Sequence, residues 1–212
     1  MLGEVLRSRK TILLSALLAV LALSAVTSAA ANAVPQWHFG GTVLSESESE
    51  TVVGAAIASS LKIESSSTTC QHFVYNMEVW NLFKEGYASV NELPLFECTT
   101  NAPGCTVSSM EAEDLPWPAW VETFGGKQYL EIFGIEVKIV YSGSSCALKG
   151  TKTLLGDAGG VINNSNSTAT FDKETFEKTG TEMEIGGKSV EWTGEFPMEA
   201  FAAHRLQAVE AF

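Results

Sequence analysis

The sequence has little positive charge. It contains 13 Lys and Arg residues against 25 Asp and Glu residues, so its formal net charge is −12. Nucleic-acid binding depends on basic side chains that neutralise phosphates, and a chain this acidic repels phosphates instead. Anionic lipid surfaces are disfavoured for the same reason. We therefore expect no nucleic-acid partner, and no membrane association of the mature chain.

The signatures of common catalytic and metal sites are also missing. The three histidines, His38, His72 and His204, are scattered, and no G-x-S-x-G motif occurs. A serine hydrolase needs a base within reach of its nucleophile, and a zinc site needs His or Cys at short spacing. We expect no catalytic residue, no metal and no cofactor, and we expect His72 to be buried near Cys70. A small secreted hydrolase based on carboxylates or on a serine is the alternative.

Two fragments match parts of the serine β-lactamase signature. The segment Ser59-Ser60-Leu61-Lys62 fits S-x-x-K, and Lys178-Thr179-Gly180 fits K-T-G. However, Lys62 lies in an alternating stretch that predicts a strand, where Ser59 and Lys62 would point to opposite faces. No S-D-N motif accompanies them. We interpret both matches as coincidence.

The N-terminal segment has the pattern of a secretory signal. Three basic residues within the first ten precede an apolar run over 11–26, and Ala31-Asn32-Ala33 fits a cleavage site. The run is shorter than the about 20 apolar residues of a membrane span. We predict a signal peptide over 1–33 and a single secreted β domain over 34–212. Its charge is −14, because Lys and Arg fall from 13 to 10 and Asp and Glu from 25 to 24.

The chain contains four cysteines, which in an exported protein are expected to form two disulfides. Three pairings are open to them. Cys98 and Cys105 flank a Pro-Gly turn signal, which favours a local pair. Cys70 and Cys146 would then form the second, longer link.

Alternating apolar and polar residues predict β-strands along most of the mature chain. Gly134 indicates a bulge, and Gly186-Gly187 a compact hairpin turn. The tail over 195–212 fits a C-terminal helix or a terminal hairpin. Many short strands with Gly-rich turns predict an all-β fold, either an antiparallel sandwich or a barrel, behind an N-terminal signal helix. The expected strands are 51–58, 61–64, 71–83, 90–97, 106–109, 129–141, 147–155, 161–162, 168–171, 182–185 and 188–192.

A segment with two tryptophans and two prolines stands out between these strands. Pro116 and Pro118 argue against a helix interior and a central strand, so we predict an ordered crossing loop. Exposed on such a loop, Trp117 and Trp120 would stack on a sugar ring or another flat ligand. Alternatively, they cap an open end of the fold, because tryptophan is usually buried. Trp117 and Trp120 are therefore the candidate ligand-binding residues.

Several short motifs resemble a family of exported actinobacterial proteins of uncharacterised function. They are Trp37, Thr69-Cys70, Phe96-Glu97-Cys98, Cys105-Thr106 and Leu115-Pro116-Trp117. The resemblance covers most of the mature chain, although the family usually has Gly at the position of Glu97. It implies a secreted β domain and supplies no activity and no binding residues. We expect a non-enzymatic module that binds a glycan or cell-envelope component, or has a structural role.

Overall fold

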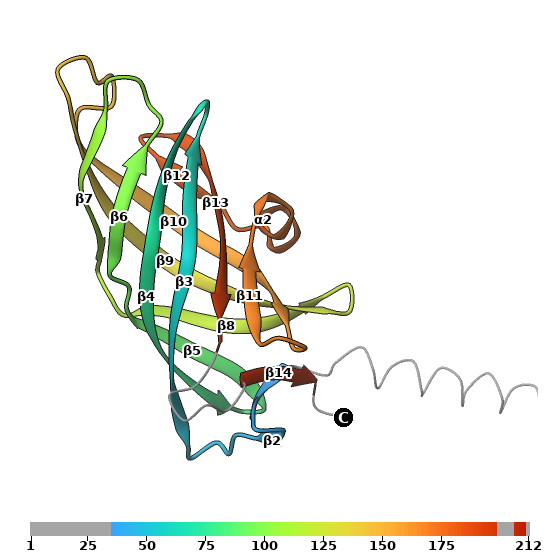
Figure 1. The fold of residues 1–212 in the computed structure, drawn as a ribbon. Helices are drawn as coiled ribbons and strands as arrows, with labels where there is room; N and C mark the ends of the chain where they lie inside the picture. The colour runs from blue at the N-terminus through green and yellow to red at the C-terminus, as the bar shows by residue number, and fades with distance from the viewer. Residues whose placement is uncertain (1–34, 199–205, 211–212) are drawn as a thin grey trace, which may run out of the picture. The chain divides into compact units, whose positions relative to one another are not determined.

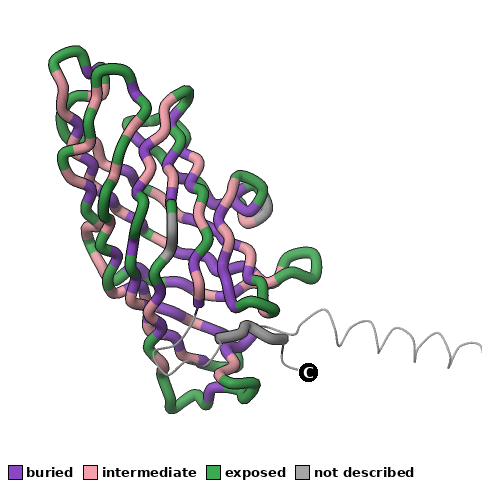
Figure 2. Tube along the Cα trace, viewed as in Figure 1, coloured by how far each residue is buried: buried purple, intermediate pink, exposed green. Residues whose placement is uncertain are grey.

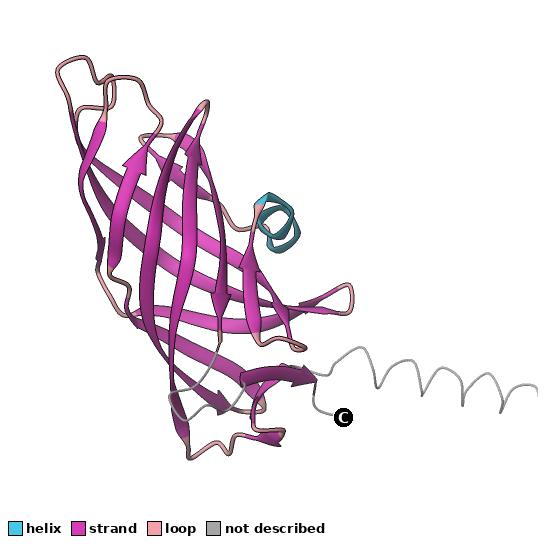
Figure 3. Cartoon of the chain, in the orientation of Figure 1, coloured by secondary structure: helices cyan, strands magenta, loops and turns pink. Residues whose placement is uncertain are grey.

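The computed structural model describes residues 35–198 and 206–210. The signal peptide expected over 1–33 lies outside this part of the chain, as does His204. Nearly every described element is a strand (Figures 1 and 3). The elements are β1 (Pro35–Phe39), β2 (Thr42–Val43), β3 (Ser49–Ile63), β4 (Ser66–Leu82), β5 (Glu85–Glu92), β6 (Leu95–Thr100), β7 (Thr106–Glu113), β8 (Trp117–Phe124), β9 (Lys127–Ser142), β10 (Gly150–Asn163), β11 (Thr168–Phe171), α2 (Lys173–Thr179), β12 (Met183–Ile185), β13 (Lys188–Pro197) and β14 (Leu206–Glu210).

Eleven of these strands form one antiparallel sheet that closes into a ring. From β3 the ladders run through β4, β5, β8, β9 and β10 to β11, and then through β13 back to β3. The expected all-β antiparallel fold is confirmed. Because the last strand pairs with the first, the architecture is the barrel and not the sandwich.

Three positions of the ring are occupied by a strand in two pieces. β5 and β6 both pair with β4, one after the other, and β8 and β7 pair in the same way with β9. β11 and β12 share the space between β10 and β13, with α2 inserted between them in the sequence. The ring therefore has eight strand positions. An interior of that size is filled by side chains or holds one small ligand.

The core lies inside the ring because alternate residues of each strand point inwards (Figure 2). β4 shows the pattern most clearly. Phe73, Tyr75, Met77 and Val79 are buried, whereas the residues between them are exposed or half-buried. The alternation read from the sequence over 71–83 is confirmed.

A second, three-stranded sheet has the order β14–β1–β2. Its Trp37 is buried and is held by Asn81, which is buried at the end of β4. The Asn81 Oδ1 accepts from the Trp37 amide at 2.8 Å, and its Nδ2 donates to the carbonyls of Trp37 and Leu44 at 3.0 and 2.8 Å. The C-terminal helix considered for the tail is wrong in the described part, since residues 206–210 form a strand.

The crossing loop expected around Trp117 and Trp120 is wrong, because both residues belong to β8, a strand between β5 and β9. Pro118 is tolerated there because it pairs only with Ser89 on the β5 side. The ladder with β9 begins one residue later, at Ala119. The missing amide of Pro118 therefore removes no bond from that ladder.

The local disulfide between Cys98 and Cys105 is also wrong. The bonds are Cys70–Cys98 and Cys105–Cys146. Cys70 on β4 lies directly opposite Cys98 on β6 in the antiparallel ladder, so the sheet register brings the two sulfurs together. The two disulfides indicate folding in an oxidising compartment.

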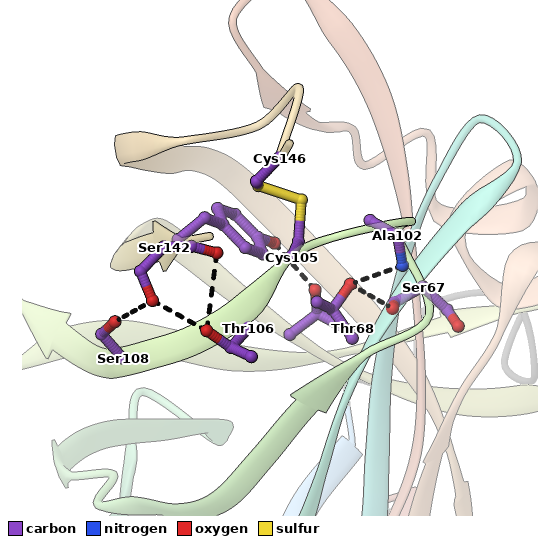
Figure 4. The surroundings of a disulfide bond; sticks show 10 residues. Ser67, Thr68, Ala102, Cys105, Thr106, Ser108, Ser142 and Cys146 are labelled. Carbon is purple, nitrogen blue, oxygen red and sulfur yellow. Dashed lines mark hydrogen bonds between the residues drawn. A yellow bond between two sulfur atoms is a disulfide. The ribbon is translucent and has the colours of Figure 1, made fainter. Parts of the chain in front are cut away.

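The second disulfide joins the segments at one end of the β7–β9 ladder. Cys105 directly precedes β7, and Cys146 follows β9 (Figure 4). The ladder ends at the pair Thr106 and Ser142, whose hydroxyls lie 2.7 Å apart. This register brings two cysteines 41 positions apart in the sequence into bonding distance.

The short helix α2 was not expected from the sequence. It begins after Asp172, whose carboxylate accepts from the Thr175 amide at 2.8 Å, and it ends at Gly180 in the left-handed region. α2 approaches β10 at Gly159, where a Cβ would lie 2.2 Å from the Thr179 hydroxyl. The glycine therefore permits the helix to pack directly on the strand.

The expected Gly134 bulge is confirmed. Gly134 has a φ of 65°, and the β9–β10 register shifts where Phe133 and Gly134 oppose the single residue Asp157. The Asp157 carboxylate accepts from the Gly134 amide at 2.8 Å. The hairpin at Gly186-Gly187 is confirmed as well, while β10 begins at Gly150, later than expected.

Candidate ligand site inside the closed sheet

Described residues line two apolar cavities inside the ring. Each has a volume of about 20 Å³, which is room for roughly one water molecule. Leu93, Trp117 and Trp192 line both cavities and therefore form the partition between them. A cavity with apolar walls stays dry and favours an apolar occupant.

The four methionines that follow Met1 all line these cavities. Met110 and Met183 lie on the first cavity, and Met77 and Met198 on the second. Methionine is unbranched and flexible, so it fills irregular gaps and repacks around different partners. The interior is thus filled by side chains well suited to rotate aside for an apolar guest.

The polar atoms of the two tryptophans in the partition are already bonded. The Trp192 Nε1 donates to the Ser59 hydroxyl at 2.5 Å, and the Trp117 Nε1 donates to the Glu113 carbonyl at 2.9 Å. A guest between the indoles would meet only their apolar ring surfaces. This favours a hydrocarbon over a polar ligand, because a buried polar group without a partner is costly.

The wall of the ring has a gap in its hydrogen bonding between β6 and β7. β5 and β8 pair over 87–90 and 117–120. Beyond that ladder β6 pairs with β4 and β7 pairs with β9, and no ladder joins β6 to β7 in the described chain. Pro94, at the break between β5 and β6, has no amide hydrogen to offer. Side-chain packing alone therefore closes the wall here.

A groove of about 540 Å³ lies on the outside of the ring at this gap. Leu93, Leu95 and Met110 line the groove and also line the first cavity. These three side chains form the barrier between the groove and the interior. Glu92 and Glu111 line the same groove and are exposed.

Neither candidate tryptophan offers the platform expected from the sequence. Trp117 is 1% exposed and points into the ring. Trp120 points outwards, half-buried, and stacks on Phe133 with the ring centres 3.8 Å apart. Residues three apart in a strand point to opposite faces, so the two indoles do not share a surface. Trp117 belongs to the internal site, and Trp120 does not.

The β-lactamase fragments do not form a catalytic site. Ser59 is buried inside the ring beside Trp192, whereas Lys62 points outwards and pairs with Glu191 at 3.0 Å. The expectation that Ser59 and Lys62 face opposite ways is confirmed. His72 was expected to be buried, but it is exposed on β4. Within the part that the structure describes, no three His, Cys, Asp or Glu residues are grouped to hold a metal ion.

One buried carboxyl stands apart from the internal site. Glu131 on β9 points outwards but is only 5% exposed, and its Oε1 has no hydrogen-bond partner among the described residues. It lies between Trp120 on β8 and Gly159 on β10. Burial, and then the nearby Glu122 and Asp157 carboxylates, raises the pKa of Glu131 from 4.5 to about 7. A protonated carboxyl at this position avoids an unpaired buried charge.

Sequence reasoning missed the three residues at the wall gap. Leu93 and Leu95 lie in the stretch 90–97, which was expected to be one strand but is divided into β5 and β6 at Leu93 and Pro94. The available signal was Pro94, because proline within a strand pattern marks a break in pairing or an edge. Met110 carried no comparable signal, since its role depends on the approach of β7 to β6.

Comparisons with protein-family models, with curated proteins and with solved structures found no match. None of the described helices is long and apolar enough to cross a membrane. The function must therefore be argued from the site itself.

Proposed function

We propose that this protein is an exported, non-enzymatic module that binds a small apolar ligand inside its closed sheet. The ligand enters through the groove between β6 and β7 and occupies the space of the two cavities. The observation that carries the proposal is that Leu93, Leu95 and Met110 line both the outer groove and the first cavity.

The chemistry of the interior supports this proposal. The partition indoles have bonded N–H groups, and the flexible methionines surround them. Occupation requires these side chains to move, because each cavity alone holds only about 20 Å³. An envelope lipid or another molecule with a hydrocarbon chain has the chemistry that such a space accepts. Export agrees with the two disulfides and with the predicted signal peptide.

The proposal is tested by titrating the folded protein with the uncharged apolar dye Nile red and following its emission. We expect saturable binding with a blue-shifted emission, as the dye leaves water. Leu95→Trp places a larger side chain at the half-buried mouth of the gap, so it should weaken or slow binding at least tenfold. Absence of saturable binding by the wild type would contradict the proposal and leave a structural role.

The neighbouring residue provides a matched control. Phe96 is 49% exposed and lies on the opposite face of the same strand. Phe96→Trp introduces the same side chain outside the ring, so dye binding should remain unchanged. Circular dichroism and thermal unfolding of both variants establish that each is folded. Equal loss of binding in both variants would place the dye site on the outer face instead.

A further inference from the structure

We infer that the ligand is an aliphatic amphiphile with a cationic head group, held between Glu92 and Glu111 at the mouth of the β6–β7 groove. Its hydrocarbon chain passes Leu93, Leu95 and Met110 into the ring. This inference rests on the proposed function and specifies the class of ligand. The proposed function places the hydrocarbon chain of the ligand inside the ring, and the inference adds the charge of its head group.

The mouth combines an apolar floor with carboxylates on two strands. Glu92 is the last residue of β5, and Glu111 lies on β7, across the gap where no ladder joins the wall. Both side chains are exposed, and neither takes part in an ion pair within the described residues. Glu111 has Lys138 opposite it in the β7–β9 ladder, at a distance beyond an ion pair. Two exposed carboxylates beside an apolar passage complement a cation attached to a hydrocarbon chain.

The surroundings of the mouth strengthen its negative potential. Glu113 and Asp114 follow on β7 and just beyond it, and Glu136 lies opposite Glu113 on β9. Burial, and then the Asp114 and Glu113 carboxylates, raises the pKa of Glu136. Lys138 is the basic residue on this stretch of β9, and its ammonium pairs with Glu113 at 3.1 Å while Glu111 also raises its pKa. One lysine thus faces the four carboxylates of Glu111, Glu113, Asp114 and Glu136. The local charge therefore stays negative.

This charge pattern discriminates between amphiphiles with the same chain. The carboxylates at the mouth would repel a fatty-acid carboxylate and attract a quaternary ammonium, and they would have little effect on an uncharged alcohol. Pairs between exposed charges are weak, so we expect each step of this order to be about fivefold in affinity at low salt. Screening should remove most of the difference at about 1 M salt, while binding of the chain persists.

The test measures displacement of Nile red by decyltrimethylammonium, 1-decanol and decanoate, each below its micelle concentration. The expected order of affinity is ammonium, alcohol, carboxylate. In the double variant Glu92→Gln/Glu111→Gln the three affinities should converge. Glu184→Gln is the matched control, because Glu184 is an exposed carboxylate on β12. Other strands separate β12 from β6 and β7 in either direction around the ring. This control variant should leave the preference unchanged.

The outcomes separate the two proposals. If none of the three compounds displaces the dye, binding of an aliphatic chain inside the sheet is refuted, and the head-group inference falls with it. If all three displace it equally, or if decanoate is preferred, the interior site stands and the cationic head group is refuted. A preference for ammonium that survives in Glu92→Gln/Glu111→Gln would also refute the assigned carboxylates.

Discussion

Replacing Glu131 with glutamine should make the protein more stable at neutral pH and remove part of its pH dependence. The folded-state pKa of Glu131 is about 7, against an ordinary value of 4.5. Between these values the folded protein holds a proton that the unfolded chain releases, so stability falls as the pH rises from about 4.5 to about 7. Each pKa unit corresponds to about 1.4 kcal/mol, so the total loss is about 3 kcal/mol.

The Glu131→Gln variant keeps the shape of the protonated carboxyl and cannot ionise. Its free energy of unfolding should match the wild type near pH 4.5 and exceed it by up to about 3 kcal/mol at pH 8. Urea unfolding of both proteins across this range, with the disulfides intact, measures the difference. The pH dependence that both proteins share drops out of the difference between their free energies of unfolding. Glu184→Gln, at an exposed position on β12, serves as the control for the Glu-to-Gln substitution itself. A difference between wild type and Glu131→Gln that is constant from pH 4.5 to pH 8 would refute the reasoning.

Three further predictions concern the framework around the site. Asn81→Ala removes three buried hydrogen bonds, two to Trp37 of β1 and one to Leu44 just after β2. The free energy of unfolding in urea should fall by about 3 kcal/mol. A loss below about 0.5 kcal/mol would mean that water replaces the amide. Gly159→Ala introduces a Cβ that would lie 2.2 Å from the Thr179 hydroxyl, so hydrogen exchange of the α2 amides should accelerate, and unchanged protection would show that the helix adapts. Non-reducing peptide mapping should recover Cys105 linked to Cys146. Replacing both with serine should cost about 4 kcal/mol for a loop of separation 41, and recovery of any other pairing would contradict the register.

The parts of the fold that were predictable depend on local patterns. The alternation over 71–83 predicted a strand there, and buried and more exposed residues do alternate along β4. Gly134 and the pair Gly186-Gly187 marked a bulge and a turn correctly, because a positive φ is a property of one residue and not of its neighbours in space. Such features can be read without knowing which strands pair.

The errors arose where the meaning of a residue depends on a partner strand. Pro118 argued against a central strand, yet it is accommodated because the β9 ladder begins one residue later. Cys98 and Cys105 are close in sequence, but Cys98 faces a cysteine 28 positions away across the sheet. Pairing register is a nonlocal quantity, and a shift of one residue turns every side chain to the other face.

Alternation, turn glycines and an even cysteine count act locally or by composition. They were therefore enough to predict the all-β class, the antiparallel strands and the presence of two disulfides. The ring closure, the disulfide partners and the burial of Trp117 and Glu131 depend on which strands pair, and they are visible only in the folded chain. The folded chain also shows a place in the wall, between β6 and β7, where no ladder joins the strands and side chains separate the interior from solvent. That gap exists because two strands each satisfy their hydrogen bonds with a different neighbour.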